Sequence, residues 1–128
     1  MATRAVGLHL ILDMWGCDER IGEPSSVREA IEQAALASGA SVLETHVHAF
    51  SPHGVTGVAI LAESHLAVHT WPEYGYLAAD LFSCGRGVRT AGVVDVFKQW
   101  FRPERIETRR LSRGRFHSRG GAKTQLVG

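Results

Sequence analysis

The fold is decided by residues 55–82, which read VTGVAILAESHLAVHTWPEYGYLAADLF. Apolar and β-branched residues alternate there with small or polar ones, and this period of two predicts strands at Val55–Ala62, His65–Thr70 and Tyr76–Phe82. The links between these strands are too short for a crossover helix. Neighbouring strands must therefore run antiparallel.

The same alternation predicts strands on both sides of this stretch. Val6–Trp15 places Val6, Leu8, Leu10 and Leu12 on one face, Ser41–Phe50 precedes the turn at 51–54, and Glu104–Leu111 forms a last strand. Residues 112–128 have no such pattern. We expect one domain over residues 1–111, followed by a basic, loose tail over 112–128.

Two helices are predicted by an apolar stripe at helical spacing. The first opens at Pro24, with Ser26 and Glu29 at the spacing of a capping box, and it ends at Gly39. The second covers Thr90–Phe101. Strands outnumber helices, which favours an α+β fold, an antiparallel β-sheet with helices packed on one face as a two-layer sandwich. The other face would also be apolar, so we expect two copies to dimerise sheet on sheet.

Composition excludes several classes of protein. The chain has 128 residues with 45% hydrophobic and 21% charged residues, which is typical of a globular domain. We see no stretch long enough to span a membrane and no signal peptide. Two cysteines do not form a secreted disulfide framework, so we expect a cytoplasmic protein.

Charge is unevenly distributed along the chain. Residues 1–101 hold 6 Lys and Arg against 11 Asp and Glu, whereas residues 102–128 hold 8 against 2. A basic end can mark a nucleic-acid partner. This end has few aromatic residues for base stacking, so we interpret it as a solvated strand and tail and expect neither nucleic acid nor membrane as a partner.

The motifs of the chain are concentrated between residues 50 and 85. They read SPHGVTG at 51–57, ESHLAVHTWPEYGY at 63–76 and LFSCG at 81–85, and GLHL at 7–10 and WGC at 15–17 precede them. Together these segments resemble the prokaryotic-type S-adenosylmethionine decarboxylase proenzymes, which are pyruvoyl-dependent. The resemblance covers residues 5–85.

The resemblance implies that the chain cleaves itself between Glu63 and Ser64, giving a β chain of residues 1–63 and an α chain of residues 64–128. A serine hydroxyl is a weak nucleophile, but it reacts more readily with the carbonyl of the preceding residue because the chain holds the two groups close together. Ser64 would become the pyruvoyl group that forms a Schiff base with the substrate. The implied partners are a small-molecule substrate and a second copy of the processed protomer, with the site built across the dimer interface.

Five further residues acquire roles from the resemblance. His69 would transfer a proton during processing, Thr56 would support processing by hydrogen bonding, and Cys84 would return a proton to the substrate carbon after decarboxylation. Phe50 would stack on adenine, and Glu73 would accept hydrogen bonds from the ribose.

Other cofactors have weaker support in the sequence. Lys98 and Lys123 are the only lysines, and neither lies in a motif that suggests pyridoxal phosphate. His46 and His48 lie two apart on a predicted strand, where His65 or His69 could complete a zinc set. No Cys-x-x-Cys or His-Glu-x-x-His accompanies them, so we expect no metal.

The resemblance implies decarboxylation of S-adenosylmethionine, which yields the aminopropyl donor for spermidine synthesis. A first alternative keeps the fold and the pyruvoyl group but acts on L-ornithine or L-arginine, with a carboxylate such as Asp13 facing the cationic side chain. A second alternative is an unprocessed, non-catalytic binding homologue.

Overall fold

The alternating segments form a single sheet in the computed structural model, which describes residues 3–62, 64–84, 88–117 and 125–126. The strands are β1 (Thr3–Trp15), β2 (Val42–Ala49), β3 (Val55–Leu61), β4 (Ser64–Trp71), β5 (Tyr76–Ser83), β6 (Arg105–His117) and β7 (Gln125–Leu126). Their order in the sheet is β2-β3-β4-β5-β1-β6-β7, and all neighbours are antiparallel.

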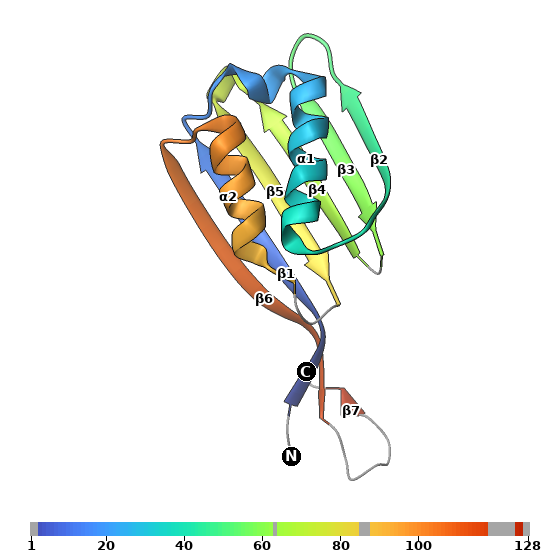
Figure 1. Cartoon of the computed structure of the whole chain (residues 1–128). Coiled ribbons are helices and arrows are strands. Elements are labelled where there is room, and N and C mark those ends of the chain that lie inside the picture. The colour runs from blue at the N-terminus through green and yellow to red at the C-terminus, as the bar shows by residue number, and fades with distance from the viewer. Residues whose placement is uncertain (1–2, 63, 85–87, 118–124, 127–128) are drawn as a thin grey trace.

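Both α-helices lie on one face of this sheet (Figure 1). They are α1 (Pro24–Ser38) and α2 (Thr90–Phe101), and two short 3₁₀ helices, η1 (Glu19–Gly22) and η2 (Pro72–Tyr74), occupy loops. The predicted α+β class, with helices packed on one face of an antiparallel sheet, is confirmed. No helix in the described part of the chain combines the length and the apolar character that a membrane crossing requires.

The core fills the space between sheet and helices. Leu10 and Leu12 of β1 are buried, as predicted for one face of that strand, and so is Met14, whereas Leu8 is half-buried and Val6 is 58% exposed. Close packing of α1 on β3 requires Gly57, since a Cβ atom there would lie 2.5 Å from Cδ1 of Ile31. The opposite face of the sheet, called the open face below, is covered by neither helix.

α1 begins at the predicted residue, but its N-terminal cap differs from the prediction. The helix begins at Pro24, whose fixed φ suits the first helical position, and Glu23 is its N-cap residue. Ser26 therefore lies inside the first turn, where its hydroxyl donates to Oε1 of Glu23 at 2.7 Å. The predicted capping box of Ser26 and Glu29 is wrong, because Ser26 lies inside the helix and Glu23 occupies the N-cap position.

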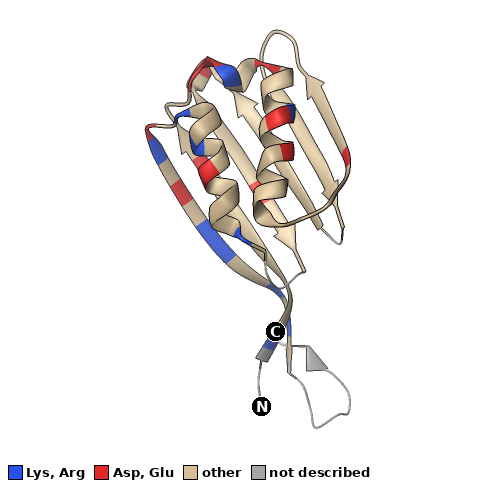
Figure 2. Ribbon diagram, in the orientation of Figure 1, with Lys and Arg blue, Asp and Glu red and all other residues tan. Residues whose placement is uncertain are grey.

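The last strand is longer than predicted. β6 continues to His117, which pairs with Thr3, so the two strands form a ribbon that extends away from the helices (Figure 1). The expectation that the chain is loose from Ser112 is wrong for residues 112–117. Backbone pairing with the start of β1 holds this segment, and such pairing needs no apolar pattern. Figure 2 shows the basic residues of β6 as bands along the strand.

Candidate active site

Thr56 and His69 form one pair on the open face. They are direct cross-strand partners in β3 and β4, and Oγ1 of Thr56 lies 3.1 Å from Nδ1 of His69. Directly opposed side chains in an antiparallel pair lie on the same face, which explains why residues 13 positions apart in sequence meet here. Either hydrogen-bond direction fixes the imidazole plane and leaves Nε2 available for proton exchange.

The Thr56–His69 pair borders a pocket of about 320 Å³. The pocket is lined by Phe50, His53, Gly54, Thr56, His69, Thr70, Trp71 and Glu73. Its walls come from the turn between β2 and β3 and from η2. The turn is closed by the Phe50 N–H, which donates to the Gly54 carbonyl at 2.8 Å, and Gly54 has the positive φ of 101° that favours glycine.

Two substrate-binding candidates, Phe50 and Glu73, therefore lie in this pocket together with Thr56 and His69. The Phe50 side chain is 51% exposed, and its ring contacts His48 with centroids 4.5 Å apart. Trp71 and His53 line the same pocket, although sequence reasoning did not single them out as site residues.

Ser64 and Cys84 lie elsewhere on the sheet. Ser64 is the first residue of β4 and pairs with Leu61 and Ser83, and Cys84 directly follows Ser83. Cys84 is exposed and lines a pocket of about 240 Å³ together with Ser83, Ser112 and residues 5–8 of β1. Glu63, the other half of the expected cleavage site, lies outside the described residues.

The structure does not bring Ser64 and His69 together within one chain. They are five residues apart on β4, a separation of about 17 Å at the rise of an extended strand. The odd spacing also places them on opposite faces. The expected site residues thus form two groups, one with Thr56, His69, Phe50 and Glu73, the other with Ser64 and Cys84.

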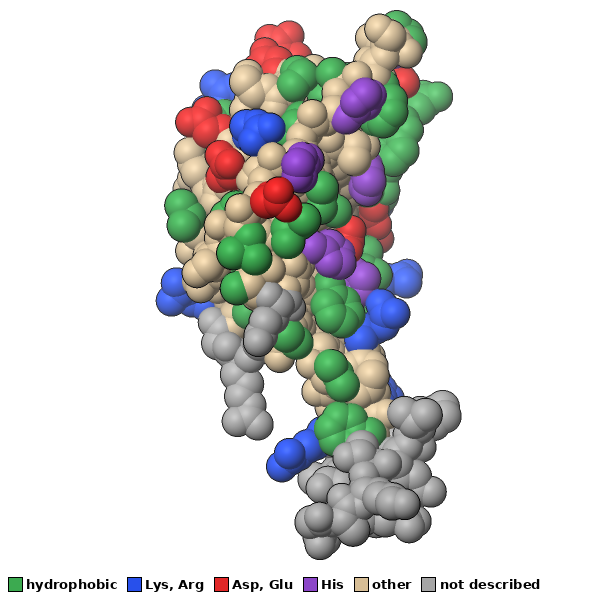
Figure 3. All heavy atoms as spheres, turned by 90° about the vertical axis from the view of Figure 1, so that its right-hand side faces the viewer, with side chains coloured by type: hydrophobic (Ala, Val, Ile, Leu, Met, Phe, Trp, Pro, Cys, Tyr) green, Lys and Arg blue, Asp and Glu red, His purple; other side chains and the backbone are tan. Residues whose placement is uncertain are grey.

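A third cluster lies on the open face and was not found from the sequence. Asp80 accepts from His9 at 2.8 Å and from His65 at 3.3 Å, and Arg113 contacts His9 at 2.8 Å. A pocket of about 300 Å³ links this cluster to His69. Figure 3 shows histidine side chains gathered along one side of the molecule. Alternation could have placed these residues on one face, but not the strand order that makes them neighbours.

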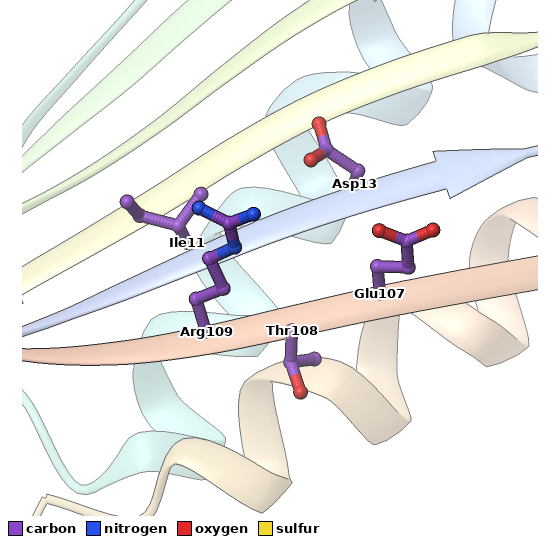
Figure 4. Close-up of a pocket in the computed structure, with 5 residues that line it drawn as sticks. All are labelled: Ile11, Asp13, Glu107, Thr108 and Arg109. Atoms are coloured by element: carbon purple, nitrogen blue, oxygen red, sulfur yellow. The ribbon is translucent and has the colours of Figure 1, made fainter.

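Asp13 belongs to a fourth group of side chains. It accepts a hydrogen bond from the Tyr76 hydroxyl, and burial together with this bond raises the pKa of Tyr76 to about 12. Asp13 and Glu107 border a pocket of about 360 Å³ whose other lining residues include Arg109 (Figure 4). The carboxylate of Asp13 is therefore already engaged within the chain.

The other cofactor candidates are dispersed. Lys98 lies exposed on α2, on the far side of the sheet from the open face, and Lys123 lies outside the described residues. His46 lies 3.7 Å from Glu44, whereas His48 contacts Phe50. Within the described ranges, no three His, Cys, Asp or Glu side chains are grouped to hold a metal ion.

Comparison with known proteins identifies relatives of the whole fold. Residues 8–114 match the family model described as S-adenosylmethionine decarboxylase. The S-adenosylmethionine decarboxylase proenzyme of Thermomicrobium roseum is 42% identical over 112 residues, covering 87% of this chain and 96% of that protein. The proenzyme of Methanococcus maripaludis is 38% identical over 112 residues, covering 87% of this chain and 92% of that protein.

Solved structures agree with these matches. The adenosylmethionine decarboxylase of Aquifex aeolicus superposes with a TM-score of 0.82 at 30% identity, covering 94% of this chain and 98% of that chain. A Trypanosoma brucei AdoMetDC monomer has a TM-score of 0.60 at 17% identity over 79% of this chain and 44% of that chain, a likeness of fold alone. The match of sequence and fold over nearly the whole chain shows that this protein belongs to the S-adenosylmethionine decarboxylase family.

Proposed function

We propose that this chain is a self-processing, pyruvoyl-dependent decarboxylase that converts S-adenosylmethionine to its decarboxylated form and CO₂, and so supplies the aminopropyl donor for spermidine synthesis. The observation that carries the proposal is the 42% identity to a decarboxylase proenzyme over 87% of the chain. The family model matches residues 8–114, a span that includes every candidate site residue.

Self-cleavage would begin at Ser64. Its hydroxyl oxygen attacks the Glu63 carbonyl carbon, the peptide C–N bond breaks, and the hydroxyl proton passes to the released nitrogen, which gives an ester and a free amine. Loss of the Ser64 α-proton then breaks the Cβ–O bond and releases Glu63 as a carboxylate. The remaining dehydroalanine takes up water and releases ammonia, which leaves a pyruvoyl group on residue 64.

The surroundings of Ser64 fit such a group. The residue begins a strand, is half-buried, and pairs with Ser83, which is 5% exposed, while Cys84 follows directly. Ser83 offers a hydroxyl and Cys84 a thiol as proton donors at this end of β4. The pyruvoyl group supplies an electron-withdrawing carbonyl to the bond that breaks during decarboxylation.

Cys84 would then hold the proton that the substrate carbon needs after CO₂ leaves. A thiol can donate this proton and take another from solvent, and the exposed position of Cys84 allows that exchange. The pocket beside Cys84, formed by residues 5–8 of β1 with Ser112, would admit the reacting end of the substrate.

His69 and Thr56 would act together in processing. The hydrogen bond between them orients the imidazole, which would remove the α-proton, while the Thr56 hydroxyl would support the developing ester. Phe50 offers an exposed aromatic face for adenine, and Glu73 offers a carboxylate for the ribose hydroxyls in the same pocket.

The group that contains Thr56 and His69 would meet the group that contains Ser64 and Cys84 through a second copy of the chain. His69 lies five positions after Ser64 on β4, so His69 of one protomer would serve residue 64 of the other in a homodimer stacked sheet on sheet, reaching its α-carbon from the open face. The open face supports this arrangement because it exposes large apolar side chains, including Ile60, Trp71 and Leu111, each at least 40% exposed.

The proposal is tested on the purified full-length chain. Mass spectrometry under denaturing conditions is expected to find the two fragments 1–63 and 64–128, the second with a borohydride-sensitive carbonyl. Trapping of CO₂ from carboxyl-labelled S-adenosylmethionine is expected to show turnover. An intact chain of 13.9 kDa after prolonged incubation would indicate the non-catalytic homologue. Release of CO₂ from ornithine or arginine, but not from S-adenosylmethionine, would show that the amino acid is the substrate instead.

The proposed location is the cytosol, supported by a sequence with only two cysteines.

A further inference from the structure

Four strands of the open face contribute one side chain each to a hydrogen-bonded chain. Nη1 of Arg113 lies 2.8 Å from Nδ1 of His9, and Nε2 of His9 lies 2.8 Å from Oδ2 of Asp80. Nε2 of His65 lies 3.3 Å from the same carboxylate oxygen. β6, β1, β5 and β4 are thus joined across the sheet by these side chains, and the two histidines share Asp80 as their acceptor.

The direction of each hydrogen bond follows from the donors present. A guanidinium group only donates, so Nδ1 of His9 must accept, and the His9 proton therefore lies on Nε2, directed at Asp80. His65 also presents Nε2 to Asp80, which accepts from both imidazoles. The Asp80 carboxylate therefore holds both histidines.

His65 is held on a second side by an aromatic ring. Phe82 is its cross-strand partner, and the two rings are stacked with centroids 6.1 Å apart and an interplanar angle of 5°. The His65 ring therefore has a defined position, although 44% of its side chain is exposed. A hydrogen bond at one edge and a stacked ring at one face leave it little rotational freedom.

His65 is also the residue that directly follows Ser64. Consecutive side chains of a strand point to opposite faces, so holding His65 on the open face also holds the backbone of Ser64, whose Cβ atom points to the other face. The attack that starts self-cleavage depends on this direction. A misplacement of about 1 Å at a reacting group can cost about a hundredfold in rate.

We propose that Asp80 is a positioning residue for self-cleavage, which it supports by holding His65 and, through His65, the first residue of β4. This inference rests on the proposed function, because it assumes cleavage before Ser64. Asp80 does not line the expected substrate pocket around Phe50 and Glu73, so its effect is assigned to the rate of chain cleavage rather than to substrate binding.

The test follows cleavage of the full-length chain during cell-free synthesis, by mass spectrometry of quenched samples. We expect Asp80→Leu, which removes the acceptor at similar size, to slow cleavage at least about tenfold, since a hydrogen bond to a charged group contributes a factor of this order. Asp80→Asn keeps a carbonyl acceptor and is expected to retain most of the rate. Asp95→Leu is the matched control, because Asp95 is exposed on α2 in the other layer.

A second pair of variants tests the route through His65. His65→Phe keeps a ring that can stack on Phe82 but donates no hydrogen bond. If Asp80 acts through His65, adding Asp80→Leu to His65→Phe slows cleavage no further, whereas independent action would multiply the two losses. Thermal unfolding of each variant in a Ser64→Ala background, where no cleavage occurs, measures folding separately.

The outcomes separate this inference from the proposed function. A wild-type chain that is never cleaved contradicts the proposed function. If the wild type is cleaved and Asp80→Leu is cleaved equally fast, the role of Asp80 is contradicted. The same holds if Asp80→Leu slows cleavage as much in the His65→Phe background as it does in the wild type. If Asp80→Leu does not fold, the cleavage rates of Asp80→Asn and His65→Phe are compared instead. A folded His65→Phe variant that cleaves at the wild-type rate overturns the inference.

Discussion

Ser64 and His69 lie on opposite faces of β4, five residues apart on the same strand. In the proposed mechanism His69 removes a proton from residue 64, yet an extended strand keeps the two about 17 Å apart. Proton transfer over this distance is not feasible without a relay. The separation is removed if each site takes His69 and Thr56 from a partner protomer that stacks on the open face and reaches the α-carbon of residue 64 from the side away from its hydroxyl.

Mixed dimers provide the first prediction. Ser64→Ala and His69→Ala chains are each expected to be inactive alone, but their co-expression should restore decarboxylation. In the mixed dimer one site combines the intact Ser64 of one chain with the intact His69 of the other. Random pairing makes half of the dimers mixed, each with one competent site, so activity near one quarter of wild type is expected.

The matched control pairs Ser64→Ala with Cys84→Ala. These residues belong to the same group, because Cys84 follows the cross-strand partner of Ser64, so the mixed dimer has no site with both intact. No recovery is expected. Equal recovery in both mixtures, or none in either, would contradict the arrangement across the interface.

The second prediction separates cleavage from decarboxylation. Ser64→Ala removes the attacking hydroxyl, so the chain should remain intact at 13.9 kDa. Cys84→Ala should still be cleaved, because the thiol is assigned to the later proton return, but turnover should fall about a hundredfold or more, the scale of a lost general acid. Mass spectrometry and CO₂ release measure the two steps. Cleavage of Ser64→Ala at the same bond would contradict the scheme.

The period-two pattern was sufficient to predict the fold class, since residues 55–82 leave no room for crossover helices. Two errors arose where a single residue or long-range pairing outweighed the pattern. Ser26 does not cap α1, because the helix already begins at Pro24 with Glu23 as its N-cap residue. Backbone pairing with Thr3 extended β6 through a segment that has no apolar alternation.

The site was less accessible to sequence reasoning than the fold. The family resemblance selected Thr56 and His69, and the structure places them 3.1 Å apart. The predicted strand began at His65 and left Ser64 before it, so the odd spacing that places Ser64 and His69 on opposite faces of one strand was not used. His9 and Asp80 were missed because their contact depends on β1 lying beside β5, a non-local pairing.

The third prediction concerns the pocket around Phe50 and Glu73. Phe50→Ala should raise KM for S-adenosylmethionine about tenfold with little change in kcat, since a stacking face for a flat base contributes on the order of 1 kcal/mol beyond its buried area. Leu43→Ala is the control, because Leu43 is a similarly exposed apolar residue of β2 that does not line this pocket. Steady-state kinetics of the cleaved proteins gives the answer, and an unchanged KM in Phe50→Ala would exclude Phe50 as the adenine wall.

The fourth prediction uses the different environments of the two cysteines. Burial, together with the nearby charge of Asp18, raises the pKa of Cys17 to about 11, whereas Cys84 is exposed. At pH 8 only about one in a thousand Cys17 thiols is therefore ionised, and the thiolate is the reactive form. Iodoacetamide at pH 8 should modify Cys84 first and leave Cys17 intact until the pH approaches 11 or the chain unfolds.

Peptide mapping after timed alkylation distinguishes the two thiols, and Cys17→Ala should leave the alkylation rate of Cys84 unchanged.

The raised pKa of Cys17 also has a consequence for stability. The folded state favours the neutral thiol, so this contribution is complete below the unfolded pKa near 9 and is lost as the pH rises toward about 11. The wild type should therefore lose stability relative to Cys17→Ala across that interval. Equal labelling of both cysteines at pH 8, or parallel stability curves, would contradict the buried environment of Cys17.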